Sequence, residues 1–157
     1  RPVRELEACR GQKVLHHNIP VSGEVNLPGV QGRMVDMTVR VRPTGGEMYR
    51  WFRIHVAKDG AHDTIIRYKP NESTLKIDRT RSGLPHDIVH TRSFLVRPQG
   101  GEVELRILLD RFSVEVFVND GEQAASSVIY TRQEADAITF EADGQVLMDV
   151  EKYDLMV

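Results

Sequence analysis

The sequence has 157 residues, of which 40% are hydrophobic and 28% charged, and its net charge is −2 at pH 7. A chain of this length can bury one sizeable core, and its nearly balanced charge gives no electrostatic case for binding nucleic acid or an anionic membrane. It contains no apolar run long enough to cross a bilayer and no secretory signal pattern, and its single cysteine, Cys9, excludes an internal disulfide and favours a reducing compartment.

The beginning of the chain is expected to form a short helix over residues 2–10. Apolar side chains recur there at a three-residue spacing (Val3, Leu6 and Cys9), proline is favoured at a helix start, and Gly11 would end the helix. The chain does not begin with methionine, and we therefore expect it to be a piece cut from a longer protein.

Most of the remaining chain consists of short segments in which apolar and polar residues alternate, the pattern of strands with one face in a core. Turn-forming residues separate these segments at spacings near ten residues, Asp143-Gly144 is predicted to be a reversal, and residues 25–33 are predicted to be a loop. The predicted strands are residues 14–21, 34–42, 52–57, 64–69, 74–79, 90–97, 103–109, 114–118, 123–130, 137–141 and 146–150. This pattern predicts an all-β sandwich or barrel, and periodicity alone does not decide between the two.

The clearest of these segments form a hairpin over residues 103–118. Placing Leu109 opposite Val114 keeps both apolar sets on one face and leaves residues 110–113 as a four-residue connection. The same register pairs Ile107 with Val116 and Leu105 with Val118. A slip by one residue would turn one whole apolar set to the opposite face, so the register is well specified.

The other face of this hairpin is only partly polar. Leu108 would lie beside Glu115, and Phe117 would lie beside Arg106. Two large apolar side chains among charges suggest that something packs on this face. Leu108 and Phe117 are therefore candidate residues of a contact surface, and the alternative is that a loop of the same domain covers them.

Three stretches carry a recognisable pattern. The longest reads Asp110-Arg111-Phe112-Ser113-Val114-Glu115-Val116-Phe117-Val118-Asn119-Asp120-Gly121-Glu122 and continues to Ile129-Tyr130; the others are Asp78-Arg79-Thr80-Arg81-Ser82-Gly83 and residues 2–10. Together they resemble the C-terminal β-sandwich module of glycoside hydrolase family 32, which includes invertases, sucrose-6-phosphate hydrolases, inulinases and levanases. Thr80 and Cys9 depart from the family pattern, which usually has Ser and Leu at these positions.

The resemblance implies two antiparallel sheets packed face to face, of the concanavalin A-like lectin/glucanase type. It implies that residues 1–11 are the end of an interdomain linker and that residues 12–157 form a single β-sandwich domain. The implied partner is an N-terminal five-bladed β-propeller of the same polypeptide, which would hydrolyse β-fructofuranosyl bonds in sucrose, sucrose 6-phosphate or fructans by a retaining double displacement. The module would buttress this propeller and could contribute to a homodimer.

No catalytic residue is predicted in this chain. The family's catalytic motifs, Asn-Asp-Pro-Asn, Arg-Asp-Pro and Glu-Cys, belong to the propeller, and none occurs here. Asp110, Glu115 and Asp120 resemble the paired carboxyl groups of glycoside hydrolysis. However, Asp110 and Asp120 lie in reversals, where aspartate bonds its own backbone, and Glu115 lies diagonally across the hairpin from Arg106, within reach of an ion pair.

No metal site and no cofactor are predicted either. His86 and His90 have the spacing of a zinc-protease helix, but Asp87 stands where that motif needs glutamate, and the context is strand-like. Positions four apart on a strand lie too far apart to share one zinc ion. His16 and His17 would point to opposite faces of a strand.

A function from a different class is kept open. Trp51, with Tyr49 beside it in the sequence, could form an aromatic platform for a sugar ring, which would make the chain a carbohydrate-binding module with its own glycan site. Core packing is the alternative use of both side chains. An unrelated lectin-like adaptor is a third possibility, and the sequence upstream of this chain would decide it.

Overall fold

The computed structural model describes residues 10–44, 47–79, 91–95, 100–111, 113–119, 123–128 and 134–155. The elements that these described residues form are all β-strands. No helix that could span a membrane is found among them. The strands are β1 (Arg10–Val25), β2 (Val35–Pro43), β3 (Trp51–Lys58), β4 (Thr64–Lys69), β5 (Thr74–Asp78), β6 (Thr91–Leu95), β7 (Val103–Leu109), β8 (Ser113–Val118), β9 (Gln123–Val128) and β10 (Ala137–Leu155).

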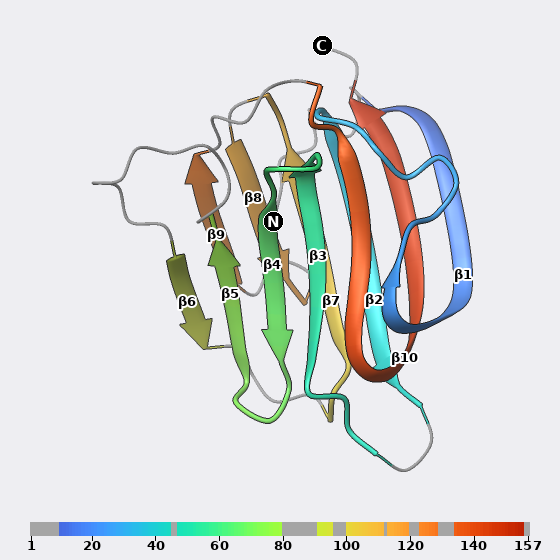
Figure 1. Ribbon diagram of the computed structural model, residues 1–157, viewed down its shortest axis with the longest axis vertical. Coiled ribbons are helices and arrows are strands. Elements are labelled where there is room, and N and C mark those ends of the chain that lie inside the picture. The colour runs from blue at the N-terminus through green and yellow to red at the C-terminus, as the bar shows by residue number, and fades with distance from the viewer. Residues whose placement is uncertain are drawn as a thin grey trace.

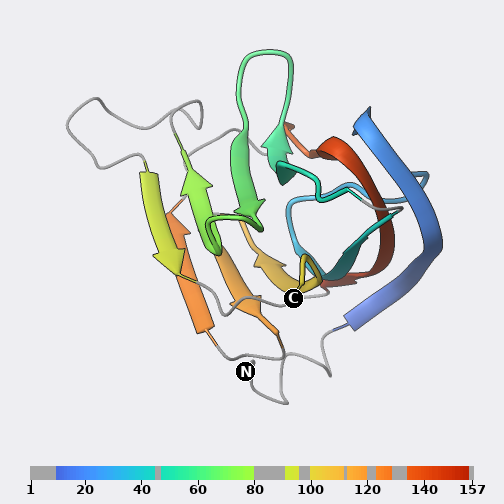
Figure 2. The same ribbon diagram turned by 90° about the horizontal axis from the view of Figure 1, so that it is seen from below.

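The strands form one antiparallel sheet that curls until its two halves face each other (Figures 1 and 2). The strand order is β6-β5-β4-β3-β10-β2-β7-β8-β9, and β1 pairs with β10. One layer holds β3 to β6, which lie nearest the viewer in Figure 1, and the other holds β2 and β7 to β9. The predicted two-sheet antiparallel β-sandwich is therefore confirmed.

Strand β10 belongs to both layers. Its residues 137–143 pair with β3, and its residues 146–154 pair with β2. The chain does fold back at the predicted reversal Asp143-Gly144, but it does so as a bend inside one continuous strand of 19 residues (Figure 1). Two predicted strands are therefore one strand, because β1 pairs with both arms of β10.

The bend in β10 requires a glycine. Gly144 has φ = +114°, and a Cβ atom built on it would lie 2.8 Å from the Cα of Tyr49. We expect Gly144→Ala to lower the free energy of unfolding by about 2–4 kcal/mol, because it adds both backbone strain and a clash with main chain that cannot move aside. Urea denaturation measures this loss. Gly60→Ala is the matched control, since its Cβ would meet no atom within 4 Å, and an equal loss in both variants would contradict the prediction.

Strand β1 begins earlier than predicted. Arg10 pairs with Leu155 of β10, so the prediction that the N-terminal helix reaches Arg10 and ends at Gly11 is wrong for these two residues. Pairing with β10 gives the backbone of this segment hydrogen-bond partners that a short isolated helix would lack. The rest of that predicted helix lies outside the described residues. The predicted loop over residues 25–33 contains only the last residue of β1 and an isolated bridge from Gln31 to Ala137.

The core fills the space between the two layers. Alternate residues of the strands point inward, as the period-two pattern requires, and most of the side chains in the core are completely buried. Phe52 and Phe140 stack there with ring centroids 6.5 Å apart. Other core residues include Met37, Val39, Ile54, Ile66, Leu105, Ile107, Met148 and Val150.

The predicted register of the β7–β8 hairpin is confirmed. Leu109 pairs with Val114, and the remaining apolar pairs follow as expected. In the connection, the Asp110 amide donates to the Ser113 carbonyl at 3.0 Å, and the Ser113 amide donates to Oδ1 of Asp110 at 2.7 Å. The side chain of Asp110 therefore closes the turn.

Candidate functional site

Two of the three acidic residues considered for catalysis, Asp110 and Glu115, lie in the part of the chain that the structure describes. Asp110 is exposed and accepts the turn hydrogen bond, and Glu115 is exposed on β8. The predicted pair of Glu115 with Arg106 is not formed: Arg106 donates instead to Asp36 of β2, from Nε at 3.0 Å and from Nη2 at 2.7 Å. The sequence could not show this, because β2 becomes the neighbour of β7 only in the folded sheet. Asp120 lies outside the described residues.

Two of the histidines considered as metal ligands, His16 and His17, each lie beside a hydrogen-bonding or ion-pair partner. His16 Nε2 lies 2.9 Å from the Pro28 carbonyl, and His17 Nδ1 lies 2.7 Å from Oδ1 of Asp149. Among the described residues, no three His, Cys, Asp or Glu side chains gather where they could hold a metal ion. His86 and His90 lie outside those residues.

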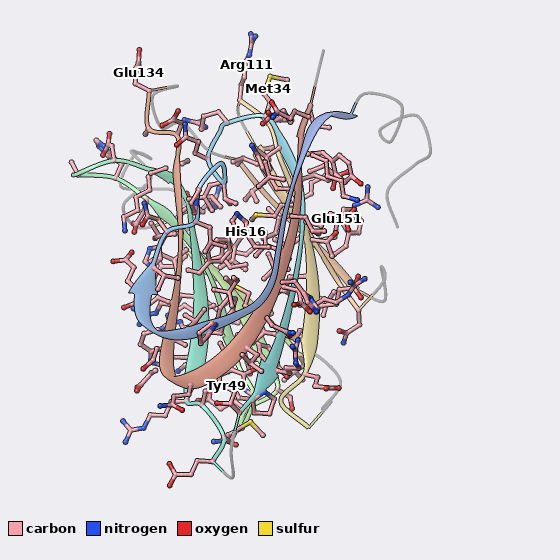
Figure 3. The ribbon with its side chains drawn as sticks, turned by 90° about the vertical axis from the view of Figure 1, so that its right-hand side faces the viewer. His16, Met34, Tyr49, Arg111, Glu134 and Glu151 are labelled. Atoms are coloured by element: carbon pink, nitrogen blue, oxygen red, sulfur yellow. The ribbon has the colours of Figure 1, made fainter. Side chains whose placement is uncertain are left out.

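The two aromatic residues considered for sugar stacking differ sharply in exposure. Tyr49 is buried beside the bend of β10 (Figure 3), its hydroxyl donates to the Gly101 carbonyl at 2.5 Å, and burial raises its pKa. It offers no ring face to a sugar. Trp51 is half-buried on the outward face of β3, and the guanidinium of Arg53 lies 3.8 Å from its ring centroid. Only Trp51 therefore stays a candidate for glycan contact, with one partner already on its ring.

The partly apolar face of the hairpin is largely covered by the chain itself. Leu108 is only 7% exposed although it points away from the core, while Phe117 is half-buried. Leu108 pairs with Glu115 and Phe117 with Arg106, as predicted. The part of this face that another domain can reach is therefore the Phe117 side.

A buried charge network on the other layer was not predicted from the sequence. His55 of β3 is buried, with Nδ1 lying 2.9 Å from Oδ2 of Asp63 and Nε2 lying 3.0 Å from Oε1 of Glu141 on β10. Glu24 of β1 lies 3.9 Å from Nε2, and Lys58 donates to Glu24. The network therefore joins three strands and the loop before β4.

Burial and hydrogen bonding shift the pKa of His55 in opposite directions. Burial lowers it, the hydrogen bonds to Asp63 and Glu141 raise it, and a smaller repulsion from Lys58 lowers it, so that the net shift is upward. The folded protein therefore favours the imidazolium form of His55. The alternation of Arg53 and His55 in the sequence shows that they share a face, but not that β10 would bring Glu141 to it.

Two of the hollows on the described part of the chain are lined by charged side chains. The larger, of about 410 Å³, lies over β2 and β7 and is lined by Arg40, Val41, Arg42, Glu102, Val103, Glu104, Asn119 and Asp149. The smaller, of about 190 Å³, lies over β4 and β5 and is lined by Arg67, Lys69, Glu72, Thr74, Lys76 and Ser93. Neither contains a pair of carboxyl groups set apart from cations, as a glycosidase site would require.

Comparison with known proteins gives the family of this chain. Residues 5–155 match the family model described as "Glycosyl hydrolases family 32 C terminal". The chain is 32% identical to a levanase of Bacillus sp. (strain L7) over 91% of this chain and 16% of the levanase. It is 29% identical to sucrose-6-phosphate hydrolase of Staphylococcus xylosus over 99% of this chain and 31% of that enzyme.

Solved structures show the same fold. Fructan 1-exohydrolase IIa from Cichorium intybus superposes with a TM-score of 0.81 at 17% identity, covering 99% of this chain and 37% of the exohydrolase. The chain thus spans about a third or less of each of these relatives. The match over residues 5–155 leaves only the two ends of the chain outside the family model, and the chain belongs to the C-terminal domain family of glycosyl hydrolases family 32.

Proposed function

We propose that this chain is the non-catalytic accessory domain of a glycoside hydrolase that acts on β-fructofuranosides, such as sucrose, sucrose 6-phosphate or fructans. The observation that carries the proposal is the family match over residues 5–155 in a chain that spans only 16% and 31% of a levanase and a sucrose-6-phosphate hydrolase. The absence of the family's catalytic motifs from the sequence supports it.

In this proposal the domain buttresses an N-terminal catalytic propeller of the same polypeptide. Residues 1–11 are the end of the linker, and residues 12–157 are the accessory domain. The Phe117 side of the β7–β8 face is the proposed contact surface, because a half-buried phenylalanine beside Arg106 gives both apolar area and a cation for a partner. A contribution of the domain to a homodimer is a further part of the proposal.

Activity assays test whether hydrolysis requires the part of the polypeptide that lies outside this chain. The 157-residue chain and the full-length polypeptide encoded by its gene are each incubated with sucrose, sucrose 6-phosphate and levan, and released fructose is measured. We expect hydrolysis by the full-length polypeptide and none above background by the 157-residue chain. Hydrolysis by the short chain would refute the accessory role, and a full-length polypeptide inactive on all three sugars would refute the assigned substrate class.

A further inference from the structure

The outward face of β3, β4 and β5 places three cationic side chains in one cross-strand row. Arg53 pairs with Arg67, and Arg67 pairs with Lys76. Figure 1 looks onto the layer that carries this row. Residues directly opposite on neighbouring strands have Cβ atoms about 4.5–5.5 Å apart, and like charges in such positions destabilise a sheet. The fold therefore carries an electrostatic cost at this row.

Only one member of the row is compensated within the part of the chain that the structure describes. Arg53 has Nη1 3.6 Å from Oε1 of Glu141, and its guanidinium lies on Trp51. For Arg67 and Lys76, no carboxylate of the described ranges lies within the 4.0 Å of an ion pair. In addition, Nε of Arg67 is buried and donates no hydrogen bond. Both observations indicate that an acceptor with negative charge is missing at this place.

Arg67 and Lys76 line the smaller hollow of about 190 Å³. Lys69 adds a third cation, and Thr74 and Ser93 add hydroxyl groups. The one carboxylate of the hollow is Glu72, which is 62% exposed at its rim and lies 3.5 Å from Nζ of Lys69. Three cations and one carboxylate leave a formal charge of +2 in a chain whose net charge is −2.

The larger hollow over β2 and β7 has no such excess. Arg40 lies 3.5 Å from Oε2 of Glu104, and Nη1 of Arg42 lies 3.0 Å from Oδ2 of Asp149. Its cations are therefore already paired, and they give no case for an anion. Charge excess, rather than size, distinguishes the smaller hollow.

We propose that the hollow lined by Arg67, Lys69 and Lys76 binds a phosphate group, either as free phosphate or as the phosphate monoester of a sugar. A dianion matches the formal excess of +2, and a guanidinium with ammonium groups and hydroxyls is a common donor set for phosphate oxygens. The hollow is smaller than the roughly 300–1,000 Å³ of sites for drug-sized ligands, so it suits a compact anion better than a glycan chain. This site is independent of the proposed accessory role.

Calorimetric titration of the 157-residue chain tests the proposal, with inorganic phosphate, glucose 6-phosphate and glucose at constant ionic strength. We expect the two phosphates to bind and to raise the Tm, and glucose to do neither. Equal affinity for the two phosphates identifies the free ion as sufficient, and tighter binding of glucose 6-phosphate identifies the monoester. Arg67→Gln and Lys76→Gln should each weaken binding about tenfold or more, while Glu72→Gln should strengthen it, because it removes the competing carboxylate.

The Lys76→Gln variant also separates loss of binding from loss of folding. Without phosphate it should melt at a higher temperature than the parent chain, because the like-charge contact with Arg67 is relieved. Arg40→Gln is the matched control, since it removes the same charge from the other layer and should leave phosphate affinity unchanged. A parent chain with a Kd weaker than about 10 mM, or an affinity that Arg67→Gln and Lys76→Gln leave intact, would overturn the proposal.

Discussion

Replacing Arg106 by methionine should lower the free energy of unfolding by about 3–5 kcal/mol, the largest loss expected from any single exchange of a charged residue discussed for this domain. Arg106 donates two hydrogen bonds to Asp36, a side chain that is only 1% exposed. Methionine has a similar length and keeps most of the packing, so the loss comes from leaving a buried carboxylate without these two bonds. Guanidinium chloride denaturation at neutral pH measures it.

Two further variants show whether the loss comes from the two hydrogen bonds that the Asp36 carboxylate loses. Arg40→Met removes an exposed arginine that lies 3.5 Å from Glu104, and it should cost less than about 1 kcal/mol. The double variant Asp36→Leu with Arg106→Met should recover much of the stability lost in Arg106→Met, because it also removes the buried carboxylate that loses its two hydrogen bonds from Arg106. A double variant as unstable as the sum of the two single variants would contradict this explanation.

Local features of the fold could be predicted well from the sequence. The β7–β8 register follows from Leu109 and Val114 alone, since the pleat allows only one register that keeps both apolar sets inside. The sequence predicts the two arms of β10 as separate strands, because glycine after aspartate usually marks a turn between two strands. In the folded protein the continuity of β10 depends on β1, whose pairing is a contact across more than a hundred residues of sequence.

Pairing between strands that are distant in the sequence also explains why the partners of Arg106 and of the cationic row could not be predicted. The hairpin alone places Arg106 within reach of Glu115, whereas Arg106 donates to Asp36 of β2, a strand that is adjacent to β7 only in the sheet order. The cationic row depends on the registers of β3 with β4 and of β4 with β5. Periodicity shows which face a side chain takes, but the partner across the strands follows only from topology.

The second large effect is a dependence of stability on pH through His55. Because the folded state raises the pKa of His55 above its unfolded value, the folded protein holds this proton more tightly than the unfolded chain. The stabilisation is fully present below the unfolded pKa of about 6.5 and is lost as the pH rises through the folded pKa. The free energy of unfolding should therefore fall as the pH is raised above about 6.5.

The variant His55→Ala isolates this contribution. At about pH 5.5–6 it should cost about 2–4 kcal/mol, because Asp63 and Glu141 lose a charged hydrogen-bond donor, and the cost should shrink as the pH rises. Urea denaturation of both proteins between about pH 5.5 and pH 9 gives the difference at each pH. His62→Ala is the control: His62 lies 3.3 Å from Oδ1 of Asp59 on the exposed surface, and its loss should stay within about 0.5 kcal/mol.

The pH dependence of the stability difference between the parent chain and His55→Ala tests the prediction, and the size of that difference does not. A histidine that only filled space would cost the same at every pH, and one held neutral by burial would give a cost that grows with rising pH. Only a histidine whose two carboxylate partners outweigh burial and the repulsion from Lys58 gives a cost that shrinks. Parallel stability curves for the parent chain and His55→Ala would therefore show that the imidazolium form is not favoured, even if the variant is strongly destabilised.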